Sequence, residues 1–284
     1  MSLRKALSKK SARHLANFFF DDIVNDDNDD DGSSRGGSLP HSFSASQSQS
    51  QARVRRTLAS GTANVRLTPP KTQAQREYAA AIEGEAPIVV GCGPAGTGKT
   101  MIPCELACKY LEEGRYARIV MVRPAVAAQE DLGYLPGTVL EKLDPYLRPL
   151  YDVLESVHDK KYVKQMLEAG TLEACAIGYC RGRTFKNCFV IADEMQNATV
   201  DQVKMLLTRI GTGTKLVLTG DPLQHDRGYG SNGLSDFIER WQRLSEDAAT
   251  SEAPAGKNVE IVRFGRVDIQ RSSVIESVLR AYEG

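Results

Sequence analysis

Short apolar runs alternate with longer amphipathic stretches along most of the chain after residue 68. Runs of this length, rich in Val, Ile and Leu, predict buried strands: Ile88–Cys92, Arg118–Val122, Leu172–Gly178, Cys188–Ala192, Lys215–Thr219 and Val259–Phe264. The stretches between and around them carry apolar residues at helical spacing, and the predicted helices are Gln73–Ile82, Met101–Glu113, a segment opening at Asp144, Thr199–Ile210, Ser231–Leu244 and Arg271–Tyr282. This alternation predicts an α/β fold, a mostly parallel sheet flanked by helices on both faces.

Residues 1–68 lack this pattern and are rich in Ser, Gln, Gly and Asp. Such a composition buries too little apolar surface to offset the entropy of ordering, so we expect a disordered tail, with residues 69–284 as the folded domain. Arg4–Phe20 is basic and ends in three Phe residues, which leaves open a solvated tail, a partner motif or a targeting segment. The Asp-rich run at 26–31 opens like a calcium loop, but Ser38 occupies the position that needs a bidentate Glu.

Composition and charge point to an ordinary water-soluble protein. The chain is 41% hydrophobic and 25% charged, with 36 basic and 36 acidic residues. Because the charges balance, overall charge does not indicate nucleic-acid binding, although a local basic groove remains possible. The six cysteines form no C-x-x-C pair, so we expect no zinc site and buried free thiols in a reducing compartment, the cytoplasm. No apolar run approaches the length of about 20 residues that spans a membrane.

The glycine-rich segment after the first strand carries the strongest chemical signal. Gly93, Pro94, Ala95, Gly96, Thr97, Gly98, Lys99 and Thr100 fit the pattern G-x-x-x-x-G-K-[ST], between a predicted strand and a predicted helix. Glycines let several backbone N–H groups point at phosphate oxygens, and the helix N-terminus favours negative charge. Lys99 is expected to reach the terminal phosphates and Thr100 to ligate Mg²⁺.

A second acidic signal follows the strand Cys188–Ala192, which ends in Asp193 and Glu194. This is the pattern of a Walker B strand, whose Asp holds the Mg²⁺ shell. Glu194 would then activate the water that attacks the terminal phosphate. Paired with the P-loop, the two acids predict a RecA-like P-loop NTPase rather than a small nucleoside kinase.

Several further residues have two readings each. Gln75 lies upstream of the P-loop strand, where its amide can read an adenine edge or simply be exposed on a helix. Asp221 and Gln224 follow a strand and are expected to lie beside the nucleotide and sense its γ-phosphate.

Tyr146 and Arg148 can stack on bases and hold phosphates, or anchor a loop. Arg123 ends a strand, at the edge where open α/β folds bind ligands. The turn Arg181-Gly182-Arg183-Thr184-Phe185 is basic.

With these residues in hand, the chain resembles the PhoH family of ATPases. The resemblance rests on motifs that occur in the family's order over about residues 69–284: TQAQREY, GPAGTGKT, VRPAV, EDLGYLPG, DPYLRPLYD, RGRTFKN, IADEMQNAT, LTRIG, LTGDPLQHD and FGRVDIQRSSVIESVLRAY. Two motifs depart from the family pattern. The usual Ile-Thr-Gln-Ile-Asp reads Pro-Leu-Gln-His-Asp at 222–226, and the usual Val-Arg-His-Pro reads Gln-Arg-Ser-Ser at 270–273.

The resemblance implies one RecA-like domain, related to superfamily 1 helicase cores, that binds ATP and Mg²⁺ and acts on single-stranded RNA. Arg209 and Arg271 match arginines that can stabilise the γ-phosphate from a neighbouring subunit. Since one such domain has only half of a helicase's nucleotide cleft, we expect a homo-oligomer, plausibly a hexamer. Two functions remain open: an RNA-dependent motor, and an ATP-gated binding module that switches affinity for RNA or a partner such as a nuclease.

Overall fold

The computed structural model describes residues 67–124, 148, 151–224, 232–248 and 258–270. Several predictions therefore lie outside the described residues. They concern the tail up to residue 66, the segment 125–147 with Tyr146, the helix expected at 271–282, and Arg271 itself. Of the predicted segment opening at Asp144, residues 148 and 151–157 are helical.

A six-stranded sheet forms the centre of the protein, with strand order β3-β2-β4-β5-β1-β6. Every pairing in it is parallel, which confirms the predicted sheet. The strands are β1 (Ile88–Cys92), β2 (Arg118–Arg123), β3 (Leu172–Ala176), β4 (Cys188–Ala192), β5 (Lys215–Gly220) and β6 (Val259–Arg263). Because all strands run the same way, their carboxyl ends share one edge of the sheet, and β5 lies between β1 and β4 at that edge.

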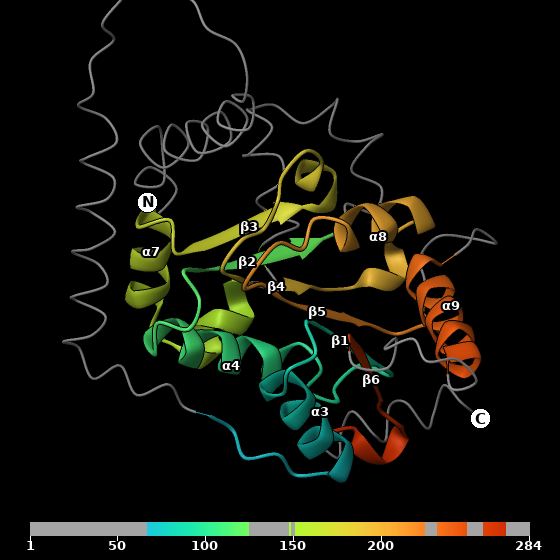
Figure 1. The fold of residues 1–284 in the computed structure, drawn as a ribbon. Coiled ribbons are helices and arrows are strands. Elements are labelled where there is room, and N and C mark those ends of the chain that lie inside the picture. The colour runs from blue at the N-terminus through green and yellow to red at the C-terminus, as the bar shows by residue number, and fades with distance from the viewer. Residues whose placement is uncertain (1–66, 125–147, 149–150, 225–231, 249–257, 271–284) are drawn as a thin grey trace, which may run out of the picture.

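Helices cover both faces of the sheet, as expected for parallel strands whose two faces are apolar (Figure 1). The helices are α3 (Gln73–Glu83), α4 (Met101–Glu112), α7 (Lys160–Glu168), α8 (Val200–Leu207) and α9 (Gly233–Ala248). Successive strand residues point to opposite faces. Val89 and Val217 pack in a cluster with α3, α4 and α7, whereas Val90 and Leu218 pack with α8 and α9. The result is a three-layer α/β fold of the RecA-like type.

Helix boundaries follow the capping chemistry of the sequence. Thr72 accepts a hydrogen bond from the Gln75 backbone, and Thr199 does the same for Gln202, each within a reciprocal capping box. Gly114 ends α4 with φ +72°, which favours glycine over any residue with a side chain. No helix in the described ranges is both long and apolar enough to cross a bilayer.

Three predicted C-terminal ends were wrong by two residues or more, and one of them is that of α8, which ends at Leu207 rather than Ile210. Strand β3 ends at Ala176 rather than Gly178, and residues Ile177–Cys180 form a 3-10 helix. The neighbouring β2 also ends there, since Ala176 pairs with Arg123, so no partner remains to extend the ladder. Helix α9 runs on to Ala248, beyond the expected Leu244.

Lys215 begins β5 at the amino edge of the sheet and is 4% exposed. Its Nζ donates to the carbonyl oxygens of Gly84 at 2.8 Å and Ala86 at 2.6 Å, and lies 3.5 Å from that of Ala81. Burial lowers the pKa of Lys215 to about 8, so the side chain keeps its three donors at pH 7. Lys215 therefore fixes the carboxyl end of α3, the helix that contacts the phosphate-binding loop.

We predict that Lys215→Met lowers the free energy of unfolding by about 1–3 kcal/mol, because these carbonyls lose a buried donor. Urea denaturation measures the change. The matched control is Lys164→Met, because Lys164 is a surface residue of α7 that pairs only with Glu168, four residues on. That control is expected to stay within about 0.5 kcal/mol of wild type. Equal stability of the two variants would contradict the role given to Lys215.

Candidate functional site

The glycine-rich loop connects β1 to α4 at the carboxyl edge of the sheet. Gly93, Gly96 and Gly98 have φ values of +147°, +83° and +86°, a region that residues with side chains rarely adopt. A Cβ on Gly93 would also collide with the carbonyl of Phe264. The Gly93 N–H donates to the Gly220 carbonyl at 3.0 Å, and the Gly96 carbonyl accepts from the Gln270 N–H at 2.8 Å. The loop is thus braced by the end of β5 and by the segment after β6.

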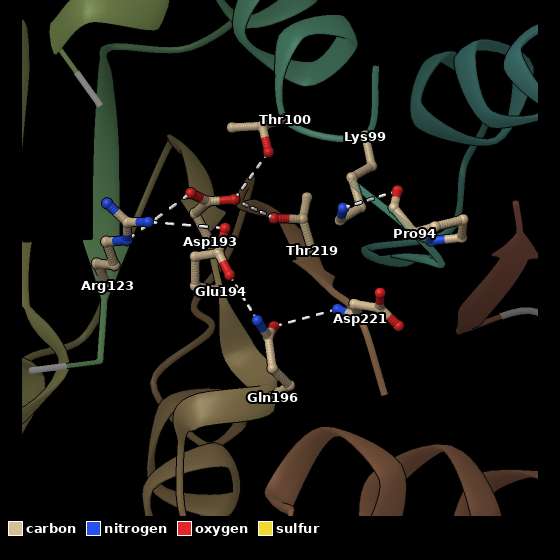
Figure 2. Close-up of polar contacts among 9 residues, drawn as sticks. All are labelled: Pro94, Lys99, Thr100, Arg123, Asp193, Glu194, Gln196, Thr219 and Asp221. Atoms are coloured by element: carbon tan, nitrogen blue, oxygen red, sulfur yellow. Dashed lines mark hydrogen bonds and ion pairs between the residues drawn. The ribbon is translucent and has the colours of Figure 1, made fainter. Parts of the chain in front are cut away.

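At the end of this loop the Thr100 side chain faces Asp193 at the end of β4, whereas the Lys99 ammonium faces Pro94 of its own loop (Figure 2). Lys99 is 8% exposed, and its Nζ donates to the Pro94 carbonyl of its own loop at 3.1 Å. The Thr100 hydroxyl donates to Asp193 Oδ1 at 2.8 Å. The Thr219 hydroxyl of β5 donates to the same oxygen at 2.6 Å. The two motifs predicted from sequence therefore meet at one carboxylate.

A magnesium ion fits this donor set. Mg²⁺ usually takes one or two carboxylates, keeps several waters and binds substrate phosphates. Asp193 offers a carboxylate, and Thr100 a hydroxyl beside it. Within the described part of the chain no three His, Cys, Asp or Glu side chains form a metal-binding cluster. A metal held mainly by protein ligands is therefore not built into these residues, whereas an ion shared with a phosphate ligand is compatible with them.

Glu194 follows Asp193 in a left-handed conformation, with φ 56° and ψ 38°. Its Oε1 lies 3.6 Å from Nη2 of Arg123, and its Oε2 accepts a hydrogen bond from Gln196 Nε2 at 2.5 Å. Arg123 also lies 4.0 Å from Asp193 Oδ2. Gln196 in turn accepts from the Asp221 N–H at 3.1 Å. The carboxylate of Glu194 is thus held on both oxygens.

Sequence reasoning placed Arg123 at the ligand-binding edge but did not count it among the site residues, and it overlooked Gln196. The signal for Arg123 was its position at the end of a strand. For Gln196 the only signal was an amide two residues after Glu194.

Gln75 is buried against the P-loop, so its reading as an exposed helix residue is wrong. Its Nε2 donates to the Thr97 carbonyl at 3.0 Å, and its Oε1 accepts from the Lys71 N–H at 2.8 Å. The neighbouring Tyr78 donates its hydroxyl hydrogen to the Lys99 carbonyl at 3.1 Å. Helix α3 therefore supports the P-loop at two points. Whether Gln75 also reads adenine stays a prediction.

Asp221 and Gln224 lie after β5, beside the P-loop, because Gly220 is hydrogen-bonded to Gly93. Asp221 is buried, and its Oδ1 accepts from the Leu223 N–H at 3.1 Å. Gln224 is exposed. The predicted placement of both residues at this edge of the sheet matches the structure, while their roles toward a γ-phosphate stay predictions.

The two arginines predicted to stabilise a γ-phosphate, Arg209 and Arg271, lie in different parts of the chain. Arg209 follows α8 near the amino edge of the sheet, since its carbonyl accepts from the Phe185 N–H just before β4. A strand length, roughly 17–20 Å, separates that edge from the P-loop of the same chain. Arg271 lies outside the described residues, directly after Gln270, whose N–H contacts the P-loop.

The basic turn and Arg148 contribute less free positive charge than their sequence suggests. Arg183 forms a bidentate ion pair with Glu173: Nη1 lies 2.5 Å from Oε1 and Nη2 lies 2.8 Å from Oε2. Both side chains are nearly buried. Arg148 pairs with Asp152 and Glu155 on its own helical segment. These pairs lie within one helical segment, so both interpretations of Arg148 stay predictions.

Known proteins match the chain closely. A sequence profile described as PhoH-like protein matches residues 68–283. The PhoH-like protein of Mycobacterium leprae is 39% identical over 214 residues, which are 75% of this chain and 58% of that protein. The PhoH-like protein of Bacillus subtilis is 39% identical, with 75% and 63% covered. Protein PhoH of Escherichia coli K12 is 40% identical over 215 residues, with 75% and 57% covered.

The chain thus spans about three fifths of the length of these relatives. Among solved structures, a Sulfolobus solfataricus SWI2/SNF2 ATPase core in complex with dsDNA aligns with TM-score 0.38 and 13% identity, over 75% of this chain and 49% of that one. The sequence match covers the P-loop, both acids that follow β4 and the segment after β5, and the chain belongs to the PhoH family of P-loop NTPases.

Proposed function

We propose that this protein is an Mg²⁺-dependent ATPase that couples hydrolysis to binding, remodelling or unwinding of single-stranded RNA. The observation that carries the ATPase part is the hydrogen bond from Thr100 to Asp193, which joins the P-loop to the acidic end of β4. Family membership and fold point in the same direction, toward nucleotide binding and hydrolysis. Six free cysteines, all buried, agree with a reducing compartment such as the cytoplasm.

The proposed reaction is transfer of the γ-phosphoryl group to water. When bound, Mg²⁺ neutralises charge on the β- and γ-phosphates. Lys99 exchanges the Pro94 carbonyl for a phosphate oxygen. Glu194 takes a proton from water, whose oxygen forms the new bond to phosphorus as the bond to the bridging oxygen of ADP breaks. Backbone N–H groups of the loop between Ala95 and Thr100 hold the remaining phosphate oxygens.

The RNA part of the proposal rests on the family resemblance and on the carboxyl edge of the sheet, where Arg123 and exposed Gln224 lie. The alternative is an ATP-gated binding module that hydrolyses slowly. The contacts of Arg123 and Gln196 with the two carboxylate oxygens of Glu194 favour this second function, because they keep the site in a resting state.

Oligomerisation is the third part of the proposal. Arg209 lies at the edge of the sheet away from its own P-loop, so only a neighbouring subunit's site could use it. Leu223 and Val267, 93% and 88% exposed, follow β5 and β6 at the nucleotide edge, where a neighbour would cover them. These placements support a ring-like homo-oligomer, plausibly a hexamer.

We predict that Lys99→Ala reduces ATP turnover by on the order of 10²–10³-fold, since a charged group aimed at the reacting phosphate is lost. The control is Lys109→Ala on α4, the helix that follows the P-loop, where the Lys109 ammonium forms a surface pair with Glu83. Coupled-enzyme assays and thermal melts of both variants make the comparison. Normal turnover by a correctly folded Lys99→Ala protein would overturn the site assignment.

Motor and switch differ in what Glu194→Gln does. For a motor, both ATP hydrolysis and strand displacement on a tailed RNA duplex should fall together, because the amide cannot accept the proton. RNA unwinding that persists in Glu194→Gln would contradict the motor mechanism. Hydrolysis by wild type without displacement, together with ATP-dependent capture of labelled RNA, would favour the switch.

The oligomer is tested by multi-angle light scattering with a non-hydrolysable ATP analogue. We expect a single assembly several times the 31.1 kDa chain mass.

Arg209→Ala should lower ATP turnover while leaving ATP affinity near wild type, because an arginine supplied in trans acts on the transition state. A monomer with full activity would contradict the proposal.

A further inference from the structure

Both carboxylate oxygens of Glu194 have a partner in this structure, and these contacts set the direction in which the carboxylate faces. Oε1 faces the Arg123 guanidinium at 3.6 Å, and Oε2 accepts from Gln196 at 2.5 Å. For the carboxylate to turn toward a water beside a nucleotide at the P-loop, one of these two contacts has to open.

The two contacts are built differently. Gln196 is 6% exposed, and its amide is fixed at its other end by the Asp221 N–H, so it forms a rigid link from Glu194 to the end of β5. The Arg123 contact is longer, and the side chains of Arg123 and Glu194 are 23% and 35% exposed. Water competes for the exposed pair, which makes it the weaker of the two. Oε1 is therefore the oxygen that becomes free.

Arg123 also lies on the far side of Glu194 from the nucleotide. Strand β2 neighbours β4, while the P-loop follows β1, which is separated from β4 by β5. Figure 2 shows the same order, with Arg123 on one side of Asp193 and Glu194, and Lys99 and Pro94 on the other. The ion pair thus draws Oε1 away from the P-loop side, where the nucleotide is proposed to bind. A ligand that takes Arg123 away approaches from the β2 side and is not the nucleotide.

We propose that Arg123 is a positioning residue that latches Glu194 in a resting state, and that a phosphate of single-stranded RNA opens the latch by pairing with Arg123. A guanidinium leaves a carboxylate most readily for another anion that offers two oxygens to its N–H fork, and a backbone phosphate is such an anion. Hydrolysis then accelerates only when RNA occupies the β2 side of this edge. This inference rests on the proposed function and adds to it the residue that links RNA binding to the general base.

The experiment compares wild type with Arg123→Gln, which keeps a polar side chain but removes the charge. Without RNA, ATP turnover by the variant should rise about two- to five-fold, the factor that a partly exposed ion pair is worth. Because Arg123 also lies 4.0 Å from Asp193 Oδ2, the KM for ATP is measured in the same assays, so that a change in kcat is separated from a change in nucleotide binding. Poly(U), which stimulates wild type, should no longer stimulate the variant. The double variant with Glu194→Gln should lose the gain, since the gain acts through that base.

A binding measurement without ATP or Mg²⁺ gives a second readout. Fluorescence anisotropy with labelled poly(U) should show weaker binding by Arg123→Gln, and a slope of log affinity against log salt that is smaller by about one phosphate contact. The control is Arg243→Gln on α9, an exposed arginine that pairs only with Glu239 in its own helix. It should match wild type in basal turnover, poly(U) stimulation and salt slope. Arg123→Lys keeps the charge and should restore the wild-type basal rate.

Each contrary result has a distinct meaning. If ATP turnover is lower in Arg123→Gln than in wild type, the latch is overturned and the ATPase proposal stands. The same holds if poly(U) still stimulates that variant. An absence of turnover from wild type and variant under all conditions removes the proposed function and the latch together. If Arg123→Gln does not fold, Arg123→Lys decides: loss of basal turnover in that variant overturns the latch.

Discussion

One carboxylate joins the parts of the site. Asp193 Oδ1 accepts hydrogen bonds from Thr100, at the end of the P-loop, and from Thr219, near the end of β5. Asp193 is 5% exposed and its own N–H donates to the Val122 carbonyl of β2. A buried carboxylate is stable only when such donors surround it, so the four segments have to meet with the right register. Every other feature of the site is placed relative to this junction.

The sheet and helix α3 make that junction possible. The parallel pairing of β1 with β5 sets Cys92 beside Gly220, so that Gly93 can donate to the Gly220 carbonyl. From the other side, Gln75 and Tyr78 contact the P-loop backbone at Thr97 and Lys99. The chain thereby fixes a loop whose positive φ values are strained for any residue other than glycine. Such a loop presents its N–H groups without having to reorganise when phosphate binds.

Much of the fold was predictable because the apolar runs are short and bounded, and the P-loop and the Asp193–Glu194 pair carry their own chemistry. What the sequence could not supply is the register between strands. Val122 pairs with Ala192, which sets Arg123 beside Asp193 and Glu194. The same limit applies to Arg183, whose partner Glu173 lies ten residues earlier on β3. Two interpretations of Gln75 stayed open in the sequence because its burial depends on how α3 packs against the loop.

The central claim is that Asp193 and Thr100 together form the metal-dependent part of an ATP-hydrolysing site. The most direct measurement is ATP hydrolysis by wild type and Asp193→Asn as Mg²⁺ is titrated from zero, alongside ATP-analogue binding in EDTA. The account predicts Mg²⁺-dependent turnover by wild type, loss of that turnover in the variant, and similar analogue binding by both without metal. Turnover by Asp193→Asn that equals wild type at every Mg²⁺ concentration would contradict it.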